Sequence, residues 1–235
     1  MASQSRAKWK WLRRTFRWIF RALGLLILVL HLYAVMLKYV PVPGTLNMLL
    51  TAQKTQILQY QWVDIEAISA HLIEAVLAAE DSRFCSHAGL SLSDIRQALA
   101  ERKQSGRLRG ASTLSQQTAK NVFFWNGGGY LRKAGEAWMA VFIDFVWGKQ
   151  RLMEVYLNVA EWGDGVFGAQ AAAQARFGKS SARLTPYEAA LLAAVLPSPN
   201  RYRLDPPTPY VRKQARTYQA RMAIVKRDAL AACVR

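Results

Sequence analysis

The feature that most limits how this chain can fold is an apolar run close to its N-terminus. The 20 residues from 18 to 37 contain one fully charged side chain, Arg21. As a helix the run is about 30 Å long, which matches the hydrocarbon thickness of a bilayer. It also lacks the polar face that a helix packed in a soluble domain would show. The sequence therefore predicts a membrane-spanning anchor at residues 18–40.

Basic residues precede this run and are sparse directly after it. Residues 1–21 hold no acidic side chain and seven basic ones, which are Arg6, Lys8, Lys10, Arg13, Arg14, Arg17 and Arg21. Because basic residues stay on the cytoplasmic side, we expect a cytoplasmic basic tail at 1–17 and a periplasmic domain at 41–235. A cleaved signal peptide is the alternative, but Leu37-Lys38-Tyr39-Val40 offers no small-x-small cleavage site.

The charge of the whole chain indicates an anionic partner. The net charge is +17, from 32 Lys and Arg against 15 Asp and Glu. Nucleic acid, acidic lipid and a phosphorylated substrate all fit such a charge. An exported domain does not meet nucleic acid, so we expect a lipid or a phosphorylated substrate. The two cysteines, Cys85 and Cys233, exclude a disulfide scaffold and a cysteine-based metal cage. We expect two separate buried thiols, and one bridge between them is the alternative if the domain is exported.

Beyond a stiff linker at Pro41–Gly44 the pattern is helical almost throughout, so the fold class is predicted to be mainly α. Residues 103–111 carry glycines and basic side chains and are expected to form a loop. The expected helices are Ile65–Glu80 behind a cap at Asp64, a helix from the capping box at Ser91 to about Arg102, Ser112–Phe123, Leu131–Trp147, Gln150–Ala160, Pro186–Leu196 behind a cap at Thr185, and a basic helix after Pro209.

The first candidate for chemistry is Glu80, at the end of an otherwise apolar helix. A carboxylate in such a place is partly desolvated, which raises its pKa and suits it to general acid or base catalysis. A helix-terminal acid with a surface partner is the structural alternative, and taken alone this residue does not decide between them.

The second candidate is a polar stripe on the helix that begins at Ser112. Side chains at i, i+3, i+4, i+7 and i+8 share one face. They are Thr113, Gln116, Gln117, Lys120 and Asn121. These amides, hydroxyls and one cation suit phosphate and sugar hydroxyls, and backbone amides at Ser112 and Thr113 favour an anion. An ordinary solvated face is the alternative.

Two further clusters follow. Arg132, Lys133 and Glu136 offer a cationic pair for phosphate oxygens with a carboxylate beside it, or only a helix salt bridge worth about 0.3–0.5 kcal/mol. Farther on, Lys149, Tyr156 and Asn158 recur at fixed spacing, although the tyrosine also suits a core and the asparagine a helix cap.

In this order and spacing the clusters resemble the peptidoglycan glycosyltransferases of glycosyltransferase family 51. The matching segments are Glu80-Asp-x-x-Phe84-x-x-His87-x-Gly89, Gly110-x-Ser-Thr-x-x-Gln-Gln-x-x-Lys-Asn121, Arg132-Lys-x-x-Glu136, and Lys149-x-x-x-x-x-x-Tyr156-x-Asn158. The second segment is long and highly specific, and the similarity extends from about Ile57 to Tyr202. No transpeptidase domain follows, so the resemblance is to the monofunctional members.

The resemblance implies a lysozyme-like, mostly helical fold with one N-terminal transmembrane helix. It also implies an inverting enzyme of the inner (cytoplasmic) membrane that polymerises lipid II, forms β-1,4 linkages and releases polyprenyl diphosphate. The implied partners are lipid II, the nascent glycan chain, the membrane, and cell-wall synthesis or cell-division proteins. A divalent cation (Mg or Mn) could assist at the diphosphate, and no dedicated metal-binding side chains are expected.

The resemblance also assigns roles to the candidate residues. Glu80 is the general base on the acceptor hydroxyl, and Glu136 holds the cations or the donor in register. Charge on the leaving diphosphate is stabilised by Lys120, Arg132 and Lys133, while phosphate and sugars are positioned by Ser112, Thr113, Gln116, Gln117 and Asn121. A peptidoglycan hydrolase and a non-catalytic scaffold of the cell-wall machinery are the alternative functions.

Overall fold

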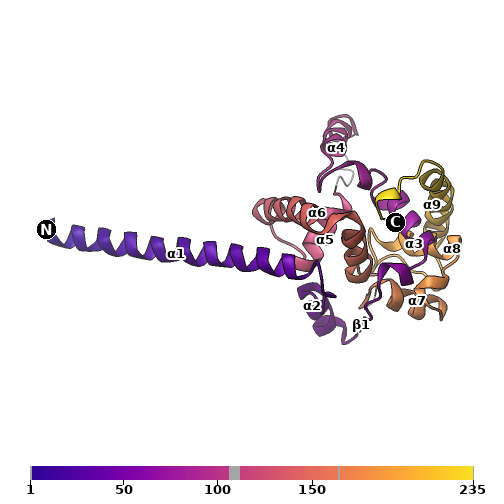
Figure 1. Ribbon diagram of the computed structural model, residues 1–235, viewed down its shortest axis with the longest axis horizontal. Helices are drawn as coiled ribbons and strands as arrows, with labels where there is room; N and C mark the ends of the chain where they lie inside the picture. The colour runs from indigo at the N-terminus through magenta and orange to yellow at the C-terminus, as the bar shows by residue number, and fades with distance from the viewer. Residues whose placement is uncertain (1, 106–111, 164, 235) are drawn as a thin grey trace. The chain divides into compact units, whose positions relative to one another are not determined.

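The computed structural model describes residues 2–105, 112–163 and 165–234. The chain divides into two compact units, one that ends at Val40 and a second that begins at Pro41. Figure 1 shows the helices and strands of each unit.

The first unit is one continuous helix, α1 (Ala2–Met36). Its segment Trp11–Met36 is, among the described residues, the one stretch long and apolar enough to cross a membrane. Apolar side chains along it are exposed, such as those of Leu25 and Leu28. The predicted basic tail and the predicted anchor therefore share one helix, whose exposed apolar surface fits a membrane anchor.

The second unit is mainly helical, which confirms the predicted fold class. Its two short strands pair in parallel, with Gln59 opposite Val166 and Tyr60 opposite Phe167. In chain order, its elements are α2 (Leu46–Thr55), β1 (Gln59–Tyr60), η1 (Ile65–Ala67), α3 (Ala70–Glu80), η2 (Phe84–Ser86), α4 (Leu92–Ser105), α5 (Leu114–Phe123), α6 (Tyr130–Val159), β2 (Val166–Phe167), α7 (Ala169–Phe177), η3 (Ser181–Arg183), α8 (Pro186–Val195), α9 (Pro209–Arg227) and η4 (Ala232–Val234).

Helix α3 is central to this unit because it packs against both α8 and α9. Every residue of α8 from Ala189 to Val195 is buried, so this helix serves as core. The capping box predicted at its start is confirmed. The Thr185 hydroxyl accepts the Glu188 N–H at 3.3 Å, and the Glu188 carboxylate accepts the Thr185 N–H at 2.9 Å.

The predicted start of α3 at Asp64 is wrong. Asp64 opens only the 3-10 turn η1, after which Ile68 is extended and the chain restarts as a helix at Ala70. The cap of α3 is Ser69, whose Oγ accepts the His71 N–H at 3.3 Å. The apolar spacing continued across this break because Ile65 and Ile68 are buried like the apolar face of α3.

Helix α4 begins as predicted and runs slightly farther, to Ser105. Ser91 Oγ accepts the Asp94 N–H at 3.3 Å, whereas the Asp94 carboxylate pairs with Arg83. The predicted loop at 103–111 falls mostly on residues 106–111, which lie outside the described residues together with Gly110 of the second motif.

Helix α6 contains the break that the sequence predicted between residues 147 and 150. Gly148 adopts φ +73°, a conformation that side chains with a Cβ rarely adopt, so the two halves of α6 change direction there. Lys149 then reaches back to Asp144, with Nζ and Oδ2 2.6 Å apart. The Ser115 hydroxyl donates to the same oxygen at 2.7 Å, which ties α5 to α6.

The expectation of two separate thiols is wrong, because Cys85 and Cys233 form a disulfide. Their Cα atoms lie 5.6 Å apart since η2 and η4 pack against each other. The two residues are 148 positions apart in the chain, so no local pattern could show that they meet. The disulfide joins the segment after Glu80 to the C-terminal end of the domain.

We predict that this disulfide stabilises the folded domain. Closing a loop of 148 residues restricts the unfolded chain and is worth about 3–5 kcal/mol on the entropic scale. The melting temperature of detergent-solubilised protein should therefore fall on addition of dithiothreitol, and equally in the Cys85→Ser, Cys233→Ser double variant. The reductant should not affect the double variant. Equal melting temperatures for oxidised and reduced wild type would contradict the prediction.

Candidate active site

The end of α3, the whole of α5 and the last turns of α6 bring three predicted site elements together. Gln117 on α5 donates from Nε2 to Glu80 Oε2 at 2.7 Å. The Gln117 carbonyl oxygen in turn accepts the Tyr156 hydroxyl at 3.3 Å. Glu80 thus lies at the end of a chain of hydrogen bonds that begins at Tyr156, which is fully buried. The sequence did not decide whether this tyrosine belongs to the site or only to the core.

A buried carboxylate next to Glu80 fixes this arrangement. Asp81, 7% exposed, accepts the backbone N–H of Leu114, the first residue of α5, at 3.0 Å. The same oxygen is hydrogen-bonded to His87 Nε2 at 2.9 Å. An anion at a helix N-terminus is favoured by the unpaired amides and the dipole. Sequence reasoning included Asp81 and His87 in the first motif without seeing that they join α3 to α5.

A second contact joins the same two segments. The Thr113 hydroxyl donates to the Gly89 carbonyl at 2.6 Å. Gly89 adopts φ +83°, and a Cβ there would come within 2.7 Å of the Val141 backbone on α6. The segment from Glu80 to Gly89 is therefore held against α5 and α6 at both of its ends.

The surroundings of Glu80 raise the pKa of its carboxyl above the ordinary value. Burial is the largest cause, and the charge of Asp81 adds to it. The hydrogen bond from Gln117 and the charge of Lys120 act in the opposite direction and lower the pKa. The result is a more basic carboxylate than an exposed glutamate, which suits acceptance of a proton from a hydroxyl.

Three cations, Lys120, Arg132 and Lys133, lie close to one another, and the charge of Lys120 also acts on Glu80. Burial lowers the pKa of Lys120, and the positive charge of Arg132 lowers it further. The pKa of Lys133 is lowered by burial and then by Arg132 and Lys120. The three side chains repel one another, so a bound anion would relieve that repulsion. This is the electrostatic environment that a diphosphate requires.

Glu136 lies among these cations and is almost fully buried, at 1% exposed. It pairs with Arg132, and its Oε2 is 3.4 Å from Lys133 Nζ. Lys133 also donates to the hydroxyl of Ser112 at 3.1 Å. These contacts connect the start of α6 to the residue before the cap of α5, and they place Ser112, Lys133 and Glu136 in one network.

The predicted stripe on α5 divides into two parts. Thr113 and Gln116 are buried and form a capping box, in which the Thr113 N–H donates to Gln116 Oε1 at 3.1 Å and the Gln116 N–H donates to Thr113 Oγ1 at 3.2 Å. A helix start needs such partners for its free amides. Their predicted contact with substrate stays a prediction. Thr113 lines one cleft, and Gln117, Lys120 and Asn121 line another.

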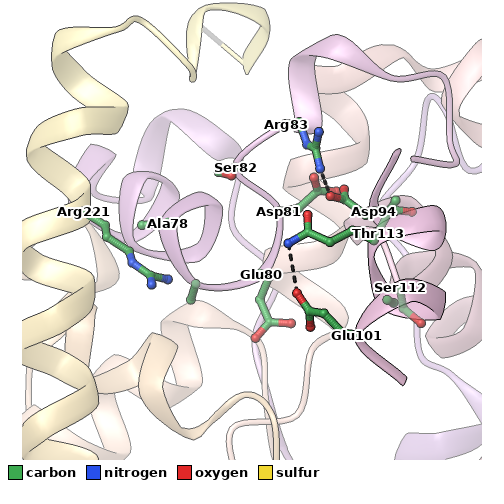
Figure 2. Close-up of a pocket in the computed structure, with 13 residues that line it drawn as sticks. Ala78, Glu80, Asp81, Ser82, Arg83, Asp94, Glu101, Ser112, Thr113 and Arg221 are labelled. Atoms are coloured by element: carbon green, nitrogen blue, oxygen red, sulfur yellow. Dashed lines mark hydrogen bonds and ion pairs between the residues drawn. The ribbon is translucent and has the colours of Figure 1, made fainter. Parts of the chain in front are cut away.

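Two clefts meet at the pair formed by Glu80 and Gln117. One has a volume of about 510 Å³, and Figure 2 shows Glu80 and Arg221 pointing into it from α3 and α9. Ser112, Arg83 and Asp94 also line this cleft. The other has a volume of about 320 Å³, and its polar lining residues are Asn47, Gln117, Lys120, Asn121, Asn126, Tyr156, Glu161, Ser198 and Asn200.

Several lining residues are not among the candidate site residues that the sequence predicted. Asn200 donates to Glu161 Oε1 at 3.0 Å, and the charge of Glu161 acts on Lys120. Arg221 reaches the first cleft from the C-terminal helix. Each comes from a segment far along the chain from Glu80. Glu161 and Asn200 lie within the region of the resemblance, and Arg221 lies beyond it on the basic helix α9.

Comparison with known proteins agrees with this geometry. The family model described as Transglycosylase matches residues 47–227, so the chain belongs to that family. The resemblance to the peptidoglycan glycosyltransferases is thereby confirmed, and with it the lysozyme-like fold.

Individual relatives match most of the length of the chain. A biosynthetic peptidoglycan transglycosylase of Rhodospirillum centenum is 50% identical over 222 residues, which cover 94% of this chain and 96% of the relative. One of Caulobacter vibrioides is 42% identical over 226 residues, covering 96% and 99%. One of Pseudomonas aeruginosa is 46% identical over 210 residues, covering 87% and 90%.

We predict that Gln117→Leu moves the acid limb of the pH–rate profile to higher pH. A base must be deprotonated, so the rate falls as the pH drops through the pKa of Glu80. Gln117 lowers that pKa by donating to the carboxylate, and its removal raises the pKa further. The measurement is the initial rate of glycan polymerisation against pH. Asn121→Leu, in the same cleft without a bond to Glu80, should leave the acid limb in place. An unshifted limb in Gln117→Leu would show that Glu80 does not control it.

Proposed function

We propose that this protein polymerises the disaccharide units of lipid II into glycan strands, forming β-1,4 linkages and releasing polyprenyl diphosphate. The observation that carries the proposal is that the charge of Lys120 acts on Glu80, a carboxylate of raised pKa held by Gln117, while the charge of Arg132 acts on both Lys120 and Lys133. Base and anion site thus lie together, as glycosyl transfer from a diphosphate requires.

In the proposed reaction, Glu80 accepts the proton of the acceptor sugar's 4-hydroxyl. The oxygen attacks the anomeric carbon of the donor from the side opposite the diphosphate. The bond from that carbon to the diphosphate oxygen breaks, its electrons remain on the diphosphate, and the configuration inverts. The Gln117 side chain orients the carboxylate during this step, because it donates to one oxygen and leaves the other for the proton.

The cations act on the leaving group. Lys120 and Arg132, with Lys133 beside them, stabilise the charge that grows on the diphosphate as the bond breaks. Glu136 keeps Arg132 and Lys133 in position through its buried ion pairs and does not itself accept the proton. Ser112 and Asn121 position phosphate and sugar, while Thr113 and Gln116 contribute by holding the start of α5.

The divalent cation stays a prediction. In the part of the chain that the structure describes, no group of three or more His, Cys, Asp or Glu side chains could hold a metal ion. Glu136, the carboxylate that lies among the cations, is already paired with Arg132 and Lys133. We therefore propose that a Mg or Mn ion, where one takes part, is held by the oxygens of the diphosphate itself.

We propose that α1 anchors the enzyme in the inner membrane with the N-terminus in the cytoplasm and the catalytic unit in the periplasm. The basic residues ahead of the apolar run support this orientation. The Cys85–Cys233 disulfide supports it independently, because disulfides persist in oxidising compartments outside the cytoplasm. Protein partners in cell-wall synthesis or cell division stay a prediction.

The orientation predicts the behaviour of a reporter enzyme that is active only outside the cytoplasm. Fused after Arg235, the reporter should be active in cells. The same fusion without residues 1–40 should be inactive, since nothing would then export it. Activity of a reporter that works only in the cytoplasm, at the same position, would contradict the proposed orientation.

The experiment that tests the function replaces Glu80 by Gln, which keeps the size of the side chain and removes the base. With labelled lipid II and detergent-solubilised protein, the wild type should make polymer that lysozyme digests. The variant should be slower by roughly 10²- to 10⁴-fold, the usual worth of a positioned base, while it still binds lipid II. Glu66→Gln, an exposed carboxylate outside both clefts, is the matched control and should be as active as the wild type.

The same assay separates the alternatives. A hydrolase would degrade finished glycan and leave lipid II intact, and a scaffold would do neither. Unchanged polymer from Glu80→Gln would remove Glu80 as the base.

A further inference from the structure

Helix α9 carries a row of polar side chains that no motif included. Tyr210, Gln214, Thr217 and Arg221 stand at i, i+4, i+7 and i+11 and so share one flank of the helix. A separate buried face, which includes Val211 and Ala215, packs towards α3 and α8. The row spans about 17 Å along the helix, a length of several sugar rings.

The row begins with a pair of tyrosines at the surface. The rings of Tyr202 and Tyr210 have centroids 4.9 Å apart and planes inclined by 31°. Gln214 Nε2 donates to the Tyr210 hydroxyl at 3.2 Å, so the second ring is held from its own helix. Tyr210 nevertheless remains 48% exposed. A fixed aromatic face open to solvent can stack on the apolar C–H face of a sugar, while neighbouring hydroxyl and amide groups bond its hydroxyls.

The row ends at the catalytic cleft. Arg221 points from α9 into the space that Glu80 borders (Figure 2). Within the described residues no carboxylate lies at ion-pair distance from Arg221, whereas Arg83 in the same cleft is paired with Asp94. The guanidinium is thus available to an oxygen of a bound molecule.

Tyr218 shows that the row runs beside the site. It lies on the buried side of α9, and its pKa is raised first by burial and then by the charge of Glu80; Tyr210, Arg221 and Tyr202 also act on it. The charge of Glu80 and that of Arg221 therefore both act on Tyr218, in agreement with the cleft that Glu80 and Arg221 line together.

We propose that Tyr202, Tyr210, Gln214, Thr217 and Arg221 form a subsite that binds the sugar rings of the glycan strand beyond the pair that reacts. The ligand class is a β-linked N-acetylhexosamine chain. This inference rests on the proposed function, since it names where the strand lies once the reaction has begun. The row contains two aromatic rings, an amide, a hydroxyl and one cation, which suits a polymer of hydroxyls and N-acetyl groups better than a membrane surface.

The opposite flank of the same helix provides the matched control. Arg212 and Arg216 lie there, exposed and roughly 180° and 140° around the helix from Arg221. An anionic lipid surface would be attracted by this flank, and a glycan strand that leads from Glu80 would not reach it.

The test uses full-length protein in detergent with the variants Tyr210→Ala, Arg221→Ala and the control Arg216→Ala. Binding of a β-1,4-linked N-acetylglucosamine hexamer, followed by NMR, should weaken about 2- to 10-fold in the first two variants, the usual effect of losing one aromatic contact. Glycan strands made from lipid II should be shorter in the same two variants. The control should match the wild type in both measurements.

Other outcomes are decisive as well. Wild-type hexamer binding and wild-type strand length in Tyr210→Ala and Arg221→Ala would overturn the subsite while the wild type still polymerises lipid II. Weaker binding of Arg221→Ala to vesicles of anionic phospholipid, with unchanged hexamer binding, would assign the row to the membrane instead. Absence of polymer from the wild type would count against the proposed function, and hexamer binding would still test the subsite.

Discussion

The site depends on one buried carboxylate, that of Asp81. Its oxygen holds the first backbone N–H of α5 and the ring of His87 at once, so the end of α3 and the start of α5 cannot separate. Glu80 is the preceding residue, and Gln117 lies one turn into α5. The contact between these two side chains is therefore a consequence of the bond at Asp81. Loss of that bond would leave an anion buried without its partners, which costs far more than the loss of a surface contact.

The pKa of the carboxylate Glu80 and the pKa values of the nearby lysines are shifted in opposite directions. Burial is the main cause of the raised pKa of Glu80, whereas the hydrogen bond from the Gln117 amide and the charge of Lys120 lower it. The pKa values of Lys120 and Lys133, in contrast, are lowered by burial and then by the positive charge of Arg132. One buried carboxylate, Glu136, compensates two of the three cations and leaves Lys120 facing the cleft. A base and an anion site can thus lie close together without neutralising each other in a salt bridge.

Features set by neighbouring residues could be predicted from the sequence, and features set by distant ones could not. The anchor, the break before Lys149 and the cap at Thr185 follow from local pattern. The start of α3 was misplaced because Ser69 lies inside a continuous apolar spacing. Helix spacing placed Thr113 and Gln116 on one face and did not show that they also form the cap of α5, so their contact with substrate stays a prediction. The bond from Leu114 to Asp81 spans 33 residues and the disulfide 148, and such contacts leave no trace in spacing.

In the proposed function, the anchor and the cations both suit the chemistry of one substrate. A substrate joined through a diphosphate to a polyprenyl chain keeps its reacting bond close to the membrane surface. A catalytic unit joined to a membrane helix is held at the same membrane surface as this substrate. The effective concentration of the substrate is therefore higher than in free solution, and less binding free energy is needed to bring the two molecules together. What remains for the protein is to recognise the diphosphate and to orient the sugars. In the proposed function, the cations near α5 and α6 recognise the diphosphate. Orienting the sugars requires contacts along more than one sugar ring. A row of side chains on α9 that leads away from Glu80 is placed to provide them.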